Sequence, residues 1–134
     1  MVNSLEEKSI QSIESAKLLI KQPFYASTVN RAYYSCINIF FHILFSKLGR
    51  NNDDFNIERK SINKGSHEYA SLLILDEVRK ESYKDFKWLQ EHIKILKQWR
   101  VDADYTDKVI TQEIASLSIS KAESITNTVK RNLL

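Results

Sequence analysis

Glycine and proline are almost absent from this chain, since Pro23, Gly49 and Gly65 are the only ones among its 134 residues. Together these two residue types make up roughly 12% of an average protein. They supply the unusual backbone angles that tight turns require. A turn-rich β-fold, a collagen-like repeat and a disordered chain are therefore excluded. We predict long helices with few interruptions, and a chain of this length can bury the core of one domain, residues 1–134.

Breakers and caps divide the chain into segments that can be assigned one by one. Ser4 and Glu7 are spaced as a capping box, and Ser66 is the predicted cap of a later helix. Residues 50–64 are expected to form a polar loop, and residues 102–107 an acidic turn. The chain is predicted to be all-α, an antiparallel up-and-down bundle of four long helices plus one shorter helix. These helices are expected at about residues 5–22, 24–48, 66–80, 82–101 and 111–133.

The predicted helix 24–48 is apolar around most of its circumference, which is typical of a helix inside a bundle. One narrow stripe is polar, with Tyr34 at its edge, and buried polar groups need partners. Three interpretations are open. The stripe could line the base of a groove for a ligand or nucleic acid, with Asn38 and His42 at its floor. It could instead form an internal network of paired polar groups, or contact a second subunit. Its members are Arg31, Ser35, Asn38, His42 and Ser46.

Arg100 stands out in the predicted helix 82–101 because it lies in register with the apolar residues that face the core. An arginine at this place can complement the dipole at the C-terminal end of the helix. It can equally project into a groove between helices. The carboxylates of Asp102 and Asp104 and the phenol of Tyr105 follow directly in the chain. We expect Arg31 to pair with Asp104 and thereby to fix the second helix against this turn.

The remaining composition argues against several classes of function. The formal net charge is only +3, too small to indicate DNA binding by itself. The three histidines and the single Cys36 do not share the spacing of metal ligands, so no metal and no cofactor are expected. One cysteine fits a reducing compartment. No signal peptide and no membrane-spanning segment are expected, so we predict a cytoplasmic protein without membrane contacts.

Three short blocks of sequence now stand in order along the chain: Asn30-Arg31-Ala32-Tyr33-Tyr34, Ser66-His67 and Arg100-Val101-Asp102-Ala103-Asp104-Tyr105. In these blocks the chain resembles the HEPN superfamily, in particular its small stand-alone bacterial branch with Arg-Ala-Tyr-Tyr and Arg-x-x-Ala-Asp-Tyr segments. The resemblance implies an antiparallel helical bundle that forms a homodimer. It also implies RNA cleavage, nucleotide binding, or partnership with a nucleotidyltransferase in toxin–antitoxin or defence systems.

The ribonucleases of the HEPN superfamily use an arginine that is followed, after four to six residues, by a histidine. Here Arg100 is followed at that spacing by Tyr105, and no histidine comes after it. A tyrosine, with an ordinary pKa of about 10, is a poor base at neutral pH. We therefore expect a nucleotide- or RNA-binding or regulatory component rather than an enzyme, with no catalytic residue assigned. The candidate binding residues are Arg31, Tyr34, Asn38, His42, His67, Arg100, Asp104 and Tyr105.

Two other functions stay open from the sequence. The first is a divergent metal-independent ribonuclease toxin, in which Arg100 acts with Tyr105 or with His42 or His67 brought in from another helix. The second is a purely structural dimerisation or assembly module, in which the polar stripe is only a subunit contact.

Overall fold

The computed structural model describes residues 4–134, and this part of the chain contains helices and no strand. The predicted all-α class is confirmed. A π-helical turn, η1 (Ile43–Lys47), directly continues the second α-helix. The six α-helices are α1 (Leu5–Leu19), α2 (Tyr25–His42), α3 (Asn52–Ser61), α4 (Ser66–Glu81), α5 (Tyr83–Tyr105) and α6 (Gln112–Leu133).

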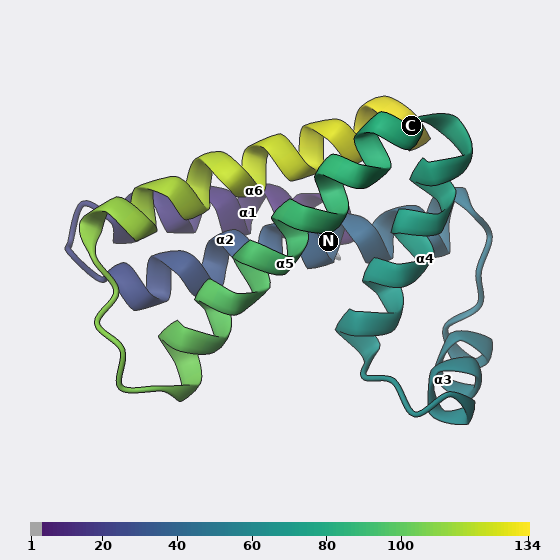
Figure 1. Ribbon diagram of the computed structural model, residues 1–134, viewed down its shortest axis with the longest axis horizontal. Helices are drawn as coiled ribbons and strands as arrows, with labels where there is room; N and C mark the ends of the chain where they lie inside the picture. The colour runs from purple at the N-terminus through teal and green to yellow at the C-terminus, as the bar shows by residue number, and fades with distance from the viewer. Residues whose placement is uncertain (1–3) are drawn as a thin grey trace.

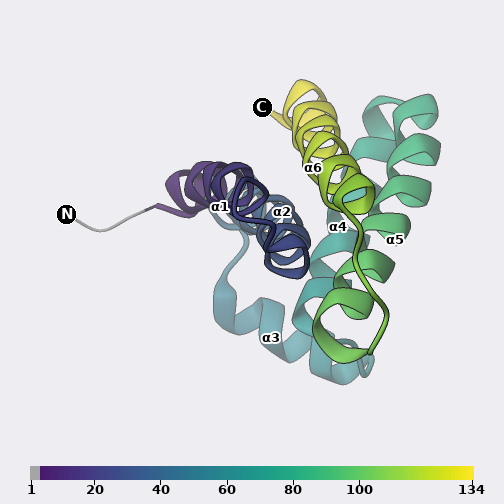
Figure 2. The same cartoon turned by 90° about the vertical axis from the view of Figure 1, so that its left-hand side faces the viewer.

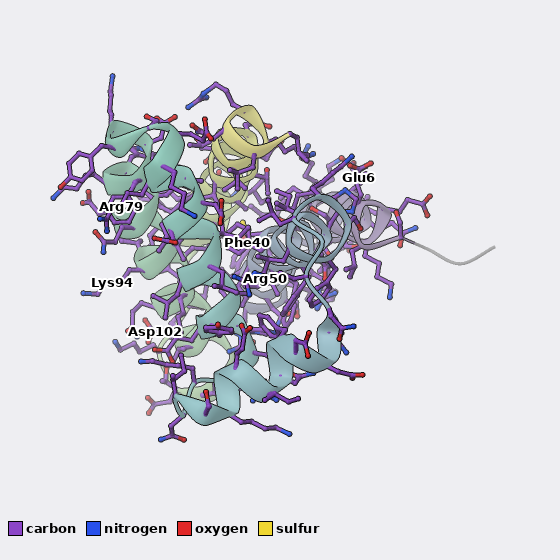
Figure 3. The ribbon with its side chains drawn as sticks, turned by 90° about the vertical axis from the view of Figure 1, so that its right-hand side faces the viewer. Glu6, Phe40, Arg50, Arg79, Lys94 and Asp102 are labelled. Atoms are coloured by element: carbon purple, nitrogen blue, oxygen red, sulfur yellow. The ribbon has the colours of Figure 1, made fainter. Side chains whose placement is uncertain are left out.

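Helix α2 lies at the centre of the fold, where it packs against α1, α4, α5 and α6. Figures 1 and 2 show α1 beside α2 on one side and the pair α4 and α5 on the other, with α6 running along both. The core residues Ala32, Ile39 and Ile43 are fully buried, and Phe40 is 1% exposed. Figure 3 shows Phe40 deep between the two sides. A helix covered by four others must be apolar around most of its surface, as α2 is.

The segment 50–64 is not the polar loop that the sequence predicts, because α3 lies within it. The side chain of Asn51 caps this helix by accepting hydrogen bonds from the backbone amides of Asp53 and Asp54. Only Phe55 of this helix is buried. Its ring packs edge-to-face on those of Phe41 and Phe45. One anchoring residue is too few to give the apolar periodicity by which a helix is recognised.

The predicted turn at residues 102–107 is also wrong in its first half, since α5 continues through Tyr105. The acidic residues here are held by side chains one helical turn earlier. The amide of Gln98 donates to Asp102 (3.0 Å), and the guanidinium of Arg100 lies 3.1 Å from the carboxylate of Asp104. Asp104 and Tyr105 are therefore placed by the same rigid helix as Arg100.

Most of the predicted helix ends agree with the structure. Ser4 caps α1 by accepting a hydrogen bond from the amide of Glu7 at 3.1 Å. Gly49 lies just beyond η1 with φ of 67°, a left-handed conformation that suits glycine at the end of a helix. Gly65, and not Ser66, is the residue before α4, and no side chain caps that helix. Within residues 4–134, no helix combines the length and the hydropathy needed to cross a membrane.

Candidate functional site

The polar stripe of α2 lies against α1 over most of its length. Ser9 and Ser12 of α1 are buried there. The hydroxyl of Ser9 donates to the carbonyl oxygen of Ser35 (2.6 Å), and the amide of Asn38 donates to the Ser12 hydroxyl (3.4 Å). Asn38 therefore belongs to a helix-to-helix contact.

His42 continues this contact at the other end of α2. Its Nε2 atom lies 3.4 Å from a carboxylate oxygen of Glu6 in α1, although the two are not aligned as a hydrogen bond. The side chain of His42 is 14% exposed. The structure thus places Asn38 and His42 at the contact of α2 with α1. Asn38 shares a small hollow with Arg31 and residues of α1, but neither Asn38 nor His42 contacts the residues around Arg100. Ser46, the last member of the stripe, is exposed.

Arg31 is held by its neighbour Asn30 and by an aromatic ring. Its Nε and Nη2 atoms donate to the Asn30 side-chain oxygen at 3.1 and 2.9 Å. Its guanidinium carbon lies 5.1 Å from the centre of the Tyr34 ring. The predicted ion pair with Asp104 is wrong, because Asn30 lies between the two and donates to Asp104 Oδ2 at 2.9 Å. Within residues 4–134, no carboxylate forms an ion pair with Arg31.

Arg100 is packed against aromatic rings and is 15% exposed. The guanidinium carbon lies 5.3, 5.7 and 5.2 Å from the ring centres of Tyr33, Tyr34 and Tyr105. Nη2 donates to the Tyr34 hydroxyl at 3.2 Å. Nε lies 3.1 Å from Asp104 Oδ2, although its N–H is not aligned with that oxygen. Burial opposes the charge, but Tyr34, Tyr105 and Asp104 together raise the pKa of Arg100.

His67, at the start of α4, joins the same aromatic group. Its Nδ1 lies 3.4 Å from the Tyr33 hydroxyl, and its ring meets the Tyr34 ring edge-on at 5.5 Å. Burial, and then the positive charges of Arg100 and Lys97, lower the pKa of His67. Burial raises the pKa of Tyr33 to about 12. At neutral pH both groups are therefore uncharged.

The structure thus brings six of the eight predicted site residues into one group, which we name the arginine–tyrosine cluster. The helical register places Arg31 and Tyr34 on α2, His67 on α4, and the rest on the last turns of α5. The label of Asp102 in Figure 3 marks this end of α5. The cluster comprises Arg31, Tyr34, His67, Arg100, Asp104 and Tyr105, together with Asn30 and Tyr33.

The sequence-based selection omitted Asn30 and Tyr33, although both belong to the same block as Arg31 and Tyr34. Asn30 joins α2 to α5 through Asp104, and Tyr33 joins α2 to α4 through His67. Four polar or aromatic residues within five positions are a signal in themselves. On a helix they cannot all face solvent, so some must contact neighbouring helices.

A hollow of about 520 Å³ opens beside the cluster, where the end of α1, the start of α2 and the end of α5 meet. This volume lies within the range of small-molecule sites. Tyr105 leaves most of its ring accessible, with 71% of the residue exposed. The hollow is lined by Leu19, Ala26, Ser27, Asn30, Arg31, Ala103 and Asp104.

The cluster offers cations, phenols and one imidazole but no set of metal ligands. Nowhere in the described part of the chain do three His, Cys, Asp or Glu side chains come together in a way that could hold a metal ion. No family model, no curated protein and no solved structure matches this chain. The function has to be inferred from the chemistry of the cluster.

The two arginines of the cluster are expected to differ in their effect on stability. Arg100→Met breaks an ion pair, a hydrogen bond and three ring contacts, so we expect the free energy of unfolding to fall by about 1–3 kcal/mol. Arg31→Met removes contacts with Asn30 and one ring, so we expect a loss below about 0.5 kcal/mol. Urea unfolding followed by circular dichroism measures both. Equal losses in the two variants would contradict this assignment.

The lowered pKa of His67 is expected to make the fold less stable in acid. A histidine that binds its proton less readily when folded favours the unfolded state once the pH falls below about 6.5. We expect His67→Gln to weaken the dependence of the free energy of unfolding on pH between about 7.5 and 5. Burial also lowers the pKa of His92, so part of the dependence remains in this variant. An unchanged pH dependence in His67→Gln would show that His67 does not contribute.

Proposed function

We propose that this protein is a nucleotide- or RNA-binding, regulatory component of a toxin–antitoxin or defence-type system. We infer that the ligand binds at the arginine–tyrosine cluster. The observation that carries the proposal is the state of Arg31, a guanidinium at the edge of a hollow with no carboxylate partner among the described residues. Guanidinium groups recognise phosphate oxygens through paired hydrogen bonds.

The surroundings of Arg31 support a phosphate ligand that carries a base. Asn30 holds the guanidinium by its Nε edge and one Nη, which leaves Nη1 free for a ligand. Asp104 is the acid of the cluster, and its carboxylate is already engaged by Asn30 and Arg100. The exposed ring of Tyr105 offers a surface on which a base can stack.

The wider proposal follows the resemblance to the HEPN superfamily. The three sequence blocks that carry the resemblance meet in the cluster, which favours a shared role for them. On this basis we propose an antiparallel bundle that forms a homodimer in the bacterial cytoplasm. A nucleotidyltransferase is the partner protein that the resemblance suggests.

Binding of AMP and of a short single-stranded RNA tests the proposal directly. We expect saturable binding that weakens as salt is added, because phosphate contacts release counterions. Arg31→Met should weaken binding by about tenfold or more, the equivalent of one charge-assisted contact. Isothermal titration calorimetry at two salt concentrations measures both effects.

Lys94→Met is the matched control for this experiment. Lys94 is an exposed cation on α5 that the structure places outside the cluster, so its loss changes the net charge equally. We expect the affinity of Lys94→Met for AMP and for RNA to stay within about twofold of that of the wild type. If the two substitutions weaken binding equally, the effect comes from the net charge of the protein and not from a contact made by Arg31. Absence of binding to either ligand would contradict the proposal and favour an assembly module.

A divergent ribonuclease is the second candidate, and one observation favours it. His67 is neutral at physiological pH and shares the rings of Tyr33 and Tyr34 with Arg100. A neutral imidazole can accept the proton of a ribose 2′-hydroxyl, and an arginine can stabilise the negative charge that develops on the phosphate. In this arrangement His67, from another helix, takes the role of the histidine that the HEPN ribonucleases carry after their arginine.

Ribonuclease activity predicts that production of the wild-type protein arrests growth and that the purified protein cleaves RNA without added metal. Arg100→Ala and His67→Ala should each lower cleavage by about a hundredfold or more, the usual contribution of a charge-stabilising donor and of a general base respectively. His42→Ala should leave cleavage unchanged, because His42 lies on the α1 side of α2. If the wild type neither arrests growth nor cleaves RNA, this second candidate is wrong.

A further inference from the structure

Both tryptophans of the chain line a second hollow, between α5 and α6 and away from the arginine–tyrosine cluster. Helices α5 and α6 lie side by side in Figures 1 and 2. Trp99 and Arg100 are consecutive, so they project about 100° apart around α5, Arg100 toward α2 and Trp99 toward α6. The hollow has a volume of about 280 Å³ and is lined by Trp88, His92, Trp99, Leu117, Ser120, Lys121 and Ser124.

The ammonium group of Lys121 is fixed inside this hollow by aromatic rings. Its Nζ donates to Nδ1 of His92 at 2.6 Å, so His92 is neutral in this arrangement. The same Nζ lies 5.5 Å from the centre of the Trp99 ring. The His92 ring in turn stacks on Trp88, with ring centres 4.2 Å apart and planes inclined by 24°. A planar wall and a fixed cation therefore stand side by side.

The charge of Lys121 is not neutralised by the fold. No carboxylate among residues 4–134 pairs with it, and the exposed Glu91 acts on it only through its charge. Burial lowers the pKa of Lys121 and also that of His92, because neither group is fully solvated. An anion that entered the hollow would supply the missing partner and would gain strength from the reduced solvation.

We propose that the hollow between α5 and α6 binds a small planar aromatic anion. Its ring lies against the indoles of Trp88 and Trp99, and its anionic group accepts a hydrogen bond from Lys121 Nζ. Ser124 lines the same hollow and offers a second donor to the anion. An aromatic carboxylate and a nucleoside monophosphate share this chemistry.

Intrinsic fluorescence tests the proposal cleanly, because the chain has two tryptophans and both line this hollow. Four probes are titrated with selective excitation of tryptophan: benzoate, its neutral analogue benzamide, AMP, and its neutral analogue adenosine. We expect a saturable change with at least one anion, and about tenfold tighter binding than for its neutral analogue. Binding of benzoate would identify the anionic group as a carboxylate, and binding of AMP would identify it as a phosphate.

Substitutions at Lys121 separate the charge from the shape of the hollow. Lys121→Met should abolish the preference for the anion but keep the weak binding of its neutral analogue, which also shows that the variant is folded. Lys121→Arg should retain the preference. Lys94→Met, which removes an exposed cation of α5, should leave it unchanged. Arg31→Met should also leave it unchanged, so this test does not depend on ligand binding at the arginine–tyrosine cluster.

Three results would overturn the proposal. One is the absence of any saturable fluorescence change with all four probes. Another is equal affinity of the wild type for an anion and its neutral analogue. The third is a loss of anion preference in Lys94→Met as large as in Lys121→Met, which would make the effect one of net charge.

Discussion

Helix α2 is covered by four other helices, so the polar groups that it buries have to find partners inside the protein. Along one side the partner is α1, where buried serines approach closely enough for the Ser9–Ser35 hydrogen bond. Near the start of α2 the partners are the last turns of α5 and the first turn of α4. The arginine–tyrosine cluster lies where Asn30, Tyr33 and Tyr34 meet those helices. The need to pair buried polar groups thus explains both the contact between α1 and α2 and the arrangement of the candidate site.

The sequence was sufficient to predict the helical class and most helix ends, because Gly49, Pro23 and the Ser4 cap act locally. It failed where an element depends on distant contacts. Helix α3 is held to the core through the single buried ring of Phe55, which leaves no periodic pattern in the sequence. The acidic residues after Val101 resemble a turn, yet they continue α5. Asp104 there accepts a hydrogen bond from Asn30 of the distant helix α2, in addition to its contact with Arg100 one turn earlier.

The candidate site was predictable in membership but not in its connections. Six of the eight selected residues meet, because their blocks occupy one end of α2, α4 and α5. The pairing of individual side chains depends on how each helix is rotated about its own axis. A single sequence does not reveal this rotation. Asp104 therefore pairs with Arg100 on its own helix, while Asn30 occupies the place expected for Arg31. Asn38 and His42 share a face with Arg31 but lie farther along α2, beneath α1.

The last turn of α5 carries Asp102 and Asp104 and no basic residue, although the C-terminal end of a helix favours positive charge. An isolated peptide of this sequence would therefore fray at this end. The turn persists in the protein because Arg100 and Asn30 hold the Asp104 carboxylate. The length of α5 is thus conditional on its docking against α2. Any molecule that competes for Asn30 or Arg100 also competes with the final turn of that helix.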